Sequence, residues 1–337
     1  MLKNIFWNGE EKRLRAFWRL FIQTILFVLL SGIISGGAIV FAIFFLGVDA
    51  SLFSGADESL IMNAIDTDLT LTLLITFSAL ASTVISVWLA GKFLDRRRFI
   101  DFGFHLNRHW WEDFAFGLTL GAFLMTVIFF IEAALGWIEI KGFLVSSKIP
   151  FGLAIVAGFI NFVSVGIREE VLSRGYHLIN IAEGLKLPAI SPKTALILAY
   201  IFSSVVFGLM HLGNPNTTLI STINLMLAGI FLGLGYILTK ELAIPIGLHI
   251  TWNFFQGKVF GFPVSGLTTT STVIAIEQKG PDLWSGGVFG PEAGLLGLLM
   301  IGLGCLLTVL WVLMRKDIYA NGVSFISSGN GRISDKA

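Results

Sequence analysis

The sequence predicts an all-α fold, a polytopic membrane helical bundle of about eight transmembrane helices. Of the 337 residues, 55% are apolar and only 13% are charged, about half the charged fraction of roughly 25% that is typical of soluble domains. The apolar residues gather in runs of about 20, the length that an α-helix needs to cross a bilayer. Basic residues fall mostly between alternate runs, as they do in membrane proteins of fixed orientation.

Eight runs of the sequence are apolar enough to form these helices. The first run has no charged residue, and it is longer than the apolar part of a secretory signal peptide. The seventh run is short. In chain order, the runs are Leu20–Val48, Leu69–Gly91, about Phe114–Leu135, about Ile149–Arg168, Thr194–Leu212, Thr217–Thr239, about Leu242–Gly257 and Ala293–Met314.

The basic residues predict the orientation of the chain. When the loops are assigned alternately to the two sides of the membrane, 19 of the 23 Lys and Arg residues fall on one side. Loops rich in Lys and Arg stay in the cytoplasm, so we expect both termini there and the protein in the cell (plasma) membrane, among its lipids. The net charge of +1 gives no electrostatic reason to expect nucleic acid as a partner.

The chain is expected to form one transmembrane domain over residues 1–320, because no soluble linker divides it. Residues 321–337 are polar and rich in Gly and Ser, a composition typical of a disordered tail. The segment Gly261–Gly290 is too long for a simple connection, and we expect it to fold over the membrane surface. The single cysteine, Cys305, excludes an intrachain disulfide and a cysteine-based metal site.

The densest group of charges lies at residues 168–174, with the sequence REEVLSR, where the fourth run ends. Charged groups are costly inside a membrane and are usually functional there. On a helix, Glu170 and Arg174 are four residues apart with the acid first, which favours an ion pair. Glu169 lies about 100° further round the helix and is not neutralised in this way. The pattern indicates either a structural charge cluster at a span end or an acid that is available for chemistry.

Two later runs also carry polar residues. His211 follows Phe207 by four positions near the end of the fifth run, where a lone histidine is more often structural than catalytic. His249 and Asn253 are four residues apart in the seventh run, so their side chains lie on one face of a helix. Such a pair indicates either a lined cavity or a hydrogen bond between helices.

Other polar residues are interpreted as structural. His105 and His109 have a spacing that suits a metal, but they lie in a basic segment beside two tryptophans, and a solvated surface is the better interpretation. Glu132 lies near the outer end of the third run, where we expect it to reach water. His177 follows Arg174 by three residues, and nothing specific assigns it to a site.

Three motifs, taken in order, resemble those of the CPBP family. This family contains the type II CAAX prenyl proteases and the bacteriocin-processing, or abortive infection, membrane proteins. The resemblance covers about residues 149–257, including a glycine-rich helix at residues 229–238. Ser173 departs from the family pattern, which commonly has a large apolar residue there. The motifs are Glu169-Glu170-x-x-x-Arg174-Gly175, Phe207-x-x-x-His211 and His249-x-x-x-Asn253.

The resemblance implies an intramembrane endopeptidase that cleaves a membrane-associated or lipidated peptide near its C-terminus. The residues that it places in the site are Glu169, His211, His249 and Asn253, with Glu170 and Arg174 in support. Peptide hydrolysis needs a base that activates water and donors that hold the oxyanion. We assign Glu169 as the base and His211 as the residue that shares the water or shuttles its proton. His249 and Asn253 would polarise the scissile carbonyl.

The cofactor stays open between none and Zn²⁺. Glu169, His211 and His249 are a possible set of three zinc ligands with an open fourth position, although the chain has no HExxH motif. Two other functions also stay open: a non-catalytic membrane scaffold or bacteriocin-immunity protein, and a transporter that uses buried polar residues as an ion path. A transporter predicts repeats or paired discontinuous helices, and the sequence shows neither.

The simple arrangement of eight spans contains one conflict of depth. It puts Glu169 near the inner end of the fourth helix and His211 near the outer end of the fifth, too far apart to share a water molecule. The conflict becomes smaller if the fourth helix continues through Leu178–Ala182. We therefore predict a long fourth helix.

Overall fold

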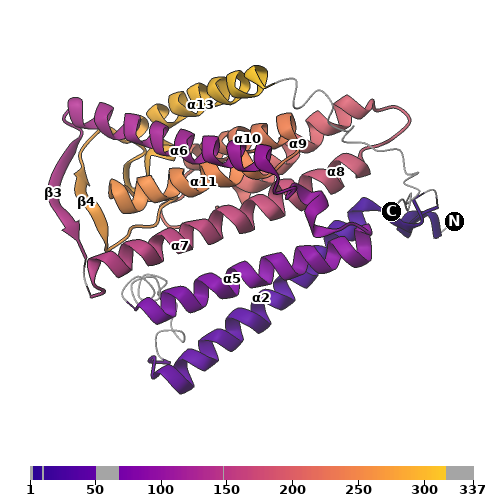
Figure 1. Cartoon of the computed structure of the whole chain (residues 1–337), viewed down its shortest axis with the longest axis horizontal. Coiled ribbons are helices and arrows are strands. Elements are labelled where there is room, and N and C mark those ends of the chain that lie inside the picture. Colours follow the sequence, from indigo (N-terminus) through magenta and orange to yellow (C-terminus); the bar gives the residue numbers. More distant parts are fainter. Residues whose placement is uncertain (1–2, 10, 51–67, 147, 316–337) are drawn as a thin grey trace.

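The computed structural model of the chain describes residues 3–9, 11–50, 68–146 and 148–315. It is a bundle of long helices that lie side by side (Figure 1). Among the described residues, seven helices are long and apolar enough to cross a membrane. They are α2 (Ala16–Leu46), α5 (Leu69–Ala90, extended by η1, Gly91–Asp95), α6 (Arg108–Ala134), α7 (Phe151–Glu170, extended by η3, Val171–Leu178, and α8, Ile179–Gly184), α9 (Pro192–Leu209), α10 (Leu219–Thr239) and α13 (Leu295–Met314).

This architecture confirms the predicted fold class, a polytopic bundle of about eight helices in an integral membrane protein. The remaining predicted span, Leu242–Gly257, forms the shorter helix α11 (Ala243–Phe254), extended by η4 (Phe255–Val259). The predicted tail, residues 321–337, lies outside the described residues. The other short elements are α1 (Lys3–Phe6), β1 (Trp7–Asn8), β2 (Arg13–Leu14), η2 (Phe99–Phe102), α12 (Asp282–Ser285), η5 (Gly287–Phe289) and η6 (Pro291–Ala293).

Polar side chains define where several long helices begin. Each occupies the position before the first helical residue and accepts a hydrogen bond from a backbone N–H of the first turn, which would otherwise lack a partner. The capping pairs are Asp68 with Leu71, Asn107 with Trp110, Ser191 with Thr194, and Thr218 with Ser221.

Helix α11 is short because it lies inside the bundle rather than at its surface. All residues from Ala243 to Trp252 are buried, and Figure 1 shows α11 in the middle of the assembly. It lies very close to α6: a Cβ added at Gly117 would be 2.4 Å from the Ile244 carbonyl oxygen, and one added at Gly247 would be 2.4 Å from the Phe114 carbonyl oxygen. Small residues of this kind let helix backbones approach closely in membrane proteins.

The fourth helix is long, as predicted. Elements α7, η3 and α8 form one continuous helix of 34 residues from Phe151 to Gly184, which at about 1.5 Å per residue is roughly 50 Å long. Glu169 lies near its middle. The chain then turns and α9 runs back alongside η3 and α8, so the end of α9 reaches the level of Glu169.

A small antiparallel ribbon lies at the end of the molecule opposite α8 (Figure 1). Strand β3 (Ile138–Val145) pairs with β4 (Thr272–Gln278), with Phe143 opposite Ile274. The sequence analysis predicted neither strand, although it expected Gly261–Gly290, which contains β4, to fold rather than to form a simple connection. Neither strand has a strict apolar–polar alternation, the main signal of a strand in a sequence, and their pairing joins segments more than 120 residues apart.

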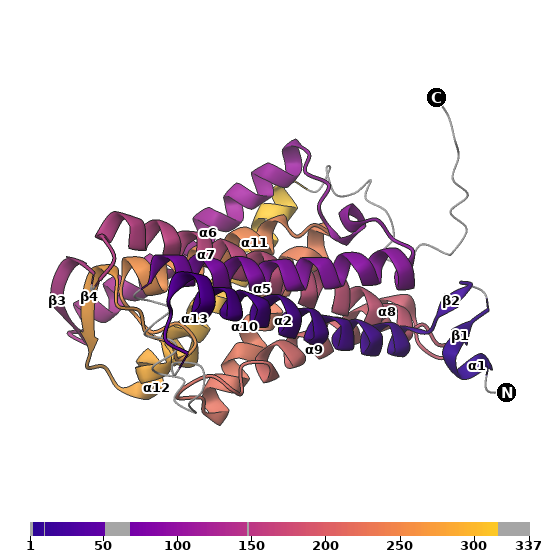
Figure 2. The same ribbon diagram turned by 90° about the horizontal axis from the view of Figure 1, so that it is seen from below.

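Helices α2 and α5 lie side by side along one face of the bundle (Figure 2). Near its first turn, α2 joins the fourth helix through buried charges. Arg19 pairs with Asp95 at the end of η1 and with Glu183 of α8. Arg13 and Arg97 also pair with Glu183. We call these five residues the terminal ion cluster.

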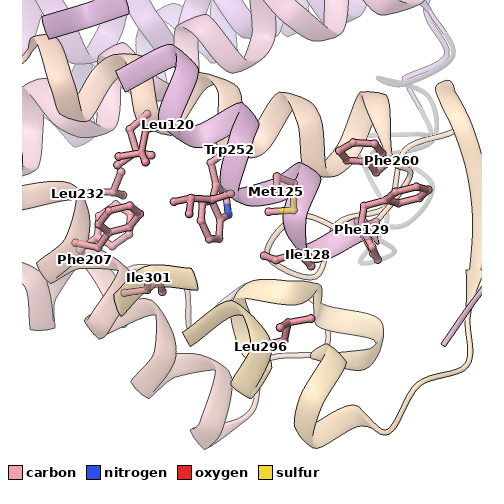
Figure 3. Packing of buried hydrophobic residues seen from close by; sticks show 14 residues of the cluster. Leu120, Met125, Ile128, Phe129, Phe207, Leu232, Trp252, Phe260, Leu296 and Ile301 are labelled. Carbon is pink, nitrogen blue, oxygen red and sulfur yellow. The ribbon is translucent and has the colours of Figure 1, made fainter. Parts of the chain in front are cut away.

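The main apolar core lies between α6, α11 and α13, and reaches α9 and α10. Figure 3 shows Trp252 of α11 at its centre, with Leu120 and Met125 of α6 nearby and Phe207 of α9 and Leu232 of α10 at one side. Close packing of such side chains fixes the rotation of a helix about its axis. The core therefore determines the direction in which the polar residues of α11 point.

Candidate active site

Glu170 lies in the last turn of α7 and connects three helices. Its Oε1 accepts a hydrogen bond of 2.8 Å from Arg174 and lies 2.8 Å from His249 Nδ1. Arg174 also donates to the backbone oxygen of Gly229 on α10, and its guanidinium lies over the ring of Phe207, 4.5 Å from the centroid. The side chains of Glu170 and Arg174 are almost completely buried. The ion pair predicted from their spacing is therefore present, and it also orients His249.

Glu169 points to a different place, as the helical spacing predicts. Its Oε2 lies 3.9 Å from His211 Nε2 and 4.0 Å from His249 Nε2. A direct hydrogen bond would be shorter, about 2.7–3.2 Å. The carboxylate and the two rings therefore surround a common point without touching one another.

The partners of the two Nδ1 atoms define which ring nitrogens face this point as acceptors. His211 Nδ1 lies 2.8 Å from the Phe207 carbonyl oxygen, and His249 Nδ1 lies 2.8 Å from Glu170. Both partners are acceptors, so each Nδ1 carries a proton, and Nε2 offers a lone pair whenever its ring is neutral. With both rings in that form, three acceptors converge, and a group placed between them has to donate hydrogen bonds or carry positive charge.

The long fourth helix resolves the conflict of depth. His211 comes two residues after α9 ends at Leu209, in a turn rather than in a helix. Because α9 runs back alongside the second half of the fourth helix, this turn lies beside Glu169. The sequence analysis placed the two residues at opposite faces of the membrane because it ended the fourth span at Arg168.

A cavity of about 520 Å³ contains all of these groups. Glu169, His211, His249 and Asn253 line it together with apolar side chains such as Phe207 and Trp252. Asn253 follows His249 by one turn of α11. A cavity of this kind, mostly apolar with a few converging polar groups, is the usual form of a ligand or substrate site.

The comparisons with known proteins agree with this site. Residues 151–255 match a family model described as type II CAAX prenyl endopeptidase Rce1-like. Over these residues the chain is similar to that family. The matched region contains Glu169, His211, His249 and Asn253. A search of curated proteins and a search of solved structures each returned no match.

The match to this family gives the general class of the protein. It is a membrane protease, and its partners are membrane lipids and a peptide or protein substrate. The family match bears out the resemblance drawn from the three motifs, which all lie inside the matched region.

The same residues were tested as a zinc site. Tetrahedral zinc with bonds of 2.0–2.2 Å holds its ligand atoms about 3.3–3.5 Å apart, and the distances from Glu169 to the two rings are 3.9 and 4.0 Å. In the part of the chain that the structure describes, no three His, Cys, Asp or Glu side chains are arranged to hold a metal ion. As arranged here, the candidate active site does not fit a three-ligand metal.

The structure also places the polar residues that were interpreted as structural. Glu132 does not reach water: it is fully buried and accepts a hydrogen bond of 2.9 Å from Gln278 of β4. The expectation of a solvated Glu132 is wrong because the β3–β4 ribbon, which the sequence did not predict, covers it. His105 and His109 are about half exposed and lie beside Glu241 and Glu112. His177 does not line the cavity.

Sequence reasoning missed two other charged residues that line the same cavity. Lys258 follows the matched region by three residues and is buried, with its stem against Gly158 of α7. Glu292 lies just before α13 and is also buried. The sequence contains one weak signal for each, a charged residue at the edge of an apolar run. Nothing in the sequence alone indicates that both face the same cavity as Glu169.

Proposed function

We propose that this protein is an intramembrane endopeptidase that hydrolyses a peptide bond with a water molecule activated by Glu169. One observation carries the proposal: Glu169 Oε2 lies 3.9 Å from His211 Nε2 and 4.0 Å from His249 Nε2 at a cavity within the helix bundle. A water molecule between Glu169 and His211 can donate one hydrogen bond to each while its oxygen faces a substrate carbonyl, and His249 Nε2 is then left for the carbonyl oxygen.

Each residue has a role that its position supports. Glu169 takes a proton from the water as the water oxygen attacks the scissile carbonyl carbon. The Asn253 amide, and His249 Nε2 when its ring carries a second proton, donate to the oxyanion, and a donor of this kind is typically worth about 3–4 kcal/mol. His211 Nε2 holds the water and then relays the proton that Glu169 took from it to the leaving nitrogen as the C–N bond breaks, which returns Glu169 to its carboxylate form. Glu170 and Arg174 keep His249 in place.

The proposed substrate is a membrane-associated or lipidated peptide cleaved near its C-terminus. The description of the matched family supports this class, and so do the apolar walls of the cavity. The proposal also includes the cell membrane as the location, with both termini in the cytoplasm, because the basic segments favour that orientation. Arg19 and Arg97 come from two of these basic segments and both pair with Glu183 at one end of the bundle, which supports the proposed orientation.

A metal-dependent peptidase is the second candidate, and one observation favours it. Each histidine bonds through Nδ1 to an oxygen and turns Nε2 to the common point, the arrangement in which metal-binding histidines are usually held. A modest inward movement of Glu169 would be needed for zinc.

One assay separates these possibilities. The purified protein in lipid vesicles is incubated with quenched lipidated and unlipidated peptides, with and without a zinc chelator, beside the Glu169→Gln variant. Cleavage that is lost in Glu169→Gln and unaffected by the chelator supports the glutamate mechanism. Cleavage that the chelator abolishes and zinc restores supports the metal site. If no peptide is cleaved, the non-catalytic scaffold or immunity protein and the less favoured transporter become the better explanations.

A further inference from the structure

A second buried carboxyl group lines the same cavity and has no place in the proposed reaction. Glu292 lies in η6, and only 4% of its surface is exposed. Its Oε1 accepts hydrogen bonds from the backbone N–H and the hydroxyl of Ser265, and its Oε2 accepts one from the Gln256 amide. Among the described residues, no Lys, Arg or His forms an ion pair with it. A buried carboxyl without a cation is costly to retain, so its contacts require an explanation.

The contacts of Glu292 lead to His211 through three connected links. Glu292 holds Ser265. The Ser265 carbonyl oxygen accepts a hydrogen bond of 2.9 Å from the side-chain amide of Asn214. The backbone N–H of Asn214 donates to the carbonyl oxygen of His211 over 3.0 Å, and the Thr217 hydroxyl donates to the same oxygen over 3.1 Å.

His211 needs such support because it does not lie in a regular helix. The helix α9 ends at Leu209, and residues 210–216 form a series of turns. Inside a helix, the backbone hydrogen bonds would hold the position of the ring. In a turn, the position of the ring depends on the contacts that the turn makes with other segments. The contact between Asn214 and Ser265 joins this turn to the segment that carries Ser265.

We propose that Glu292 is a positioning residue that holds the turn 210–217, and with it His211, through Ser265 and Asn214. The effect on catalysis rests on the proposed function, while the structural link can be tested without it. Glu292 lies 37 residues beyond the end of the matched region 151–255, so the motifs of that region do not include it.

The chain contains a matched control. Glu132 is also a buried carboxyl that accepts a hydrogen bond from a glutamine amide, that of Gln278, whose nitrogen also donates to the Ser285 carbonyl oxygen. Through Gln278, Glu132 holds the connection between β4 and α12, which belongs to the same long segment between η4 and α13 as Ser265 and Glu292. None of its described contacts reaches Asn214 or His211. If a glutamate substitution acted only by loosening this loop, Glu132→Gln and Glu292→Gln should therefore have the same effect.

The first test is backbone hydrogen exchange of residues 210–217, measured by mass spectrometry on full-length protein in lipid. We expect exchange about tenfold faster in Glu292→Gln and in Asn214→Ala than in the wild type, and no change in Glu132→Gln. Asn214 is only partly buried, so Asn214→Ala remains informative if Glu292→Gln does not fold. Unchanged exchange in Asn214→Ala, or equal changes in the two glutamate variants, would overturn the inference.

The second test uses cleavage kinetics. If the wild type is active and Glu169→Gln is not, we expect kcat to fall about tenfold in Glu292→Gln and in Asn214→Ala with little change in KM, as for a group that acts only in the transition state. The double variant should lose no more than either single one, because both remove the same link. Wild-type kcat in Asn214→Ala would overturn the catalytic part. An inactive wild type would overturn the proposed function and leave the exchange result as it stands.

Discussion

The terminal ion cluster and the candidate active site are both groups of charges inside the bundle, but they are built differently. In the cluster, Arg19 and Glu183 meet at 3.0 Å and Arg19 also contacts Asp95 directly. In the site, Glu169 lies about 4 Å from two rings that turn their lone pairs toward it. Groups that already contact their partners hold helices together, whereas groups that converge without contact leave room for a reactant.

The largest effect is expected at Glu169. Glu169→Gln removes the proposed base, and we expect the cleavage rate to fall by about 10²–10⁴-fold. The melting temperature should change little, because this carboxylate makes only a long contact of 3.4 Å with Arg168. Initial rates and thermal melting of the same preparations test both expectations. A variant that loses its fold together with its activity would contradict the distinction between the two regions.

Arg19 should behave in the opposite way. Arg19→Met leaves Asp95 buried without its cation, and we expect a loss of about 3–5 kcal/mol of stability. The folded fraction should keep its activity, because Arg19 does not line the cavity. Denaturant unfolding in detergent measures the loss.

The control for Arg19 is an exposed ion pair. Lys141 and Glu277 meet at 2.6 Å on the β3–β4 ribbon with about half of each side chain exposed, so Glu277→Gln should cost less than about 1 kcal/mol. Equal losses in the two variants would show that burial of the cluster does not matter.

Glu170 combines the properties of both regions. It contacts Arg174 and His249 directly, like the cluster, but it orients a residue of the site. Glu170→Gln should lower kcat by about 10–100-fold, the usual effect of removing the partner that orients a functional histidine, and also lower the melting temperature. If only kcat falls, Glu170 acts only as part of the candidate active site. If only the melting temperature falls, Glu170 has only a structural role, like the terminal ion cluster.

The smallest effect concerns pH. Burial raises the pKa of Glu292 from 4.5 to about 7, although the hydrogen bonds from Ser265 and Gln256 lower it. The buried position of the carboxyl group against Ser265 therefore favours its neutral form, whereas a carboxyl group exposed by opening of this contact has the ordinary pKa. The contact of Glu292 with Ser265 is therefore most stable below pH 4.5, and it loses stability as the pH rises towards 7. Lys258 and His211 line the same cavity, and Gln256 and Ser265 contact the carboxyl directly.

Hydrogen exchange of residues 261–267 tests this dependence once the intrinsic effect of pH on exchange has been removed. Exchange should become a few-fold faster between pH 5 and pH 7.5 in the wild type, and the change should be absent in Glu292→Gln. A dependence that persists in Glu292→Gln would assign the effect to Lys258 or His211 instead.

The sequence by itself determined the membrane class, the approximate helices and the set of motif residues. These depend on local properties: the length of apolar runs, the four-residue spacing that pairs Glu170 with Arg174, and the order of three motifs. The long fourth helix also followed from the sequence, since Glu169 and His211 could share a site only if that helix continued.

Only the tertiary structure decided how these parts meet. The burial of Glu132 depends on a ribbon that pairs residues 138–145 with 272–278, and the link from Glu292 to His211 depends on a loop that folds back over the cavity. Such contacts join residues far apart in the chain, and no local spacing records them. The distance of about 4 Å between Glu169 and the two histidines arises in the same way, because it is set by the packing of α9 and α11 against the fourth helix.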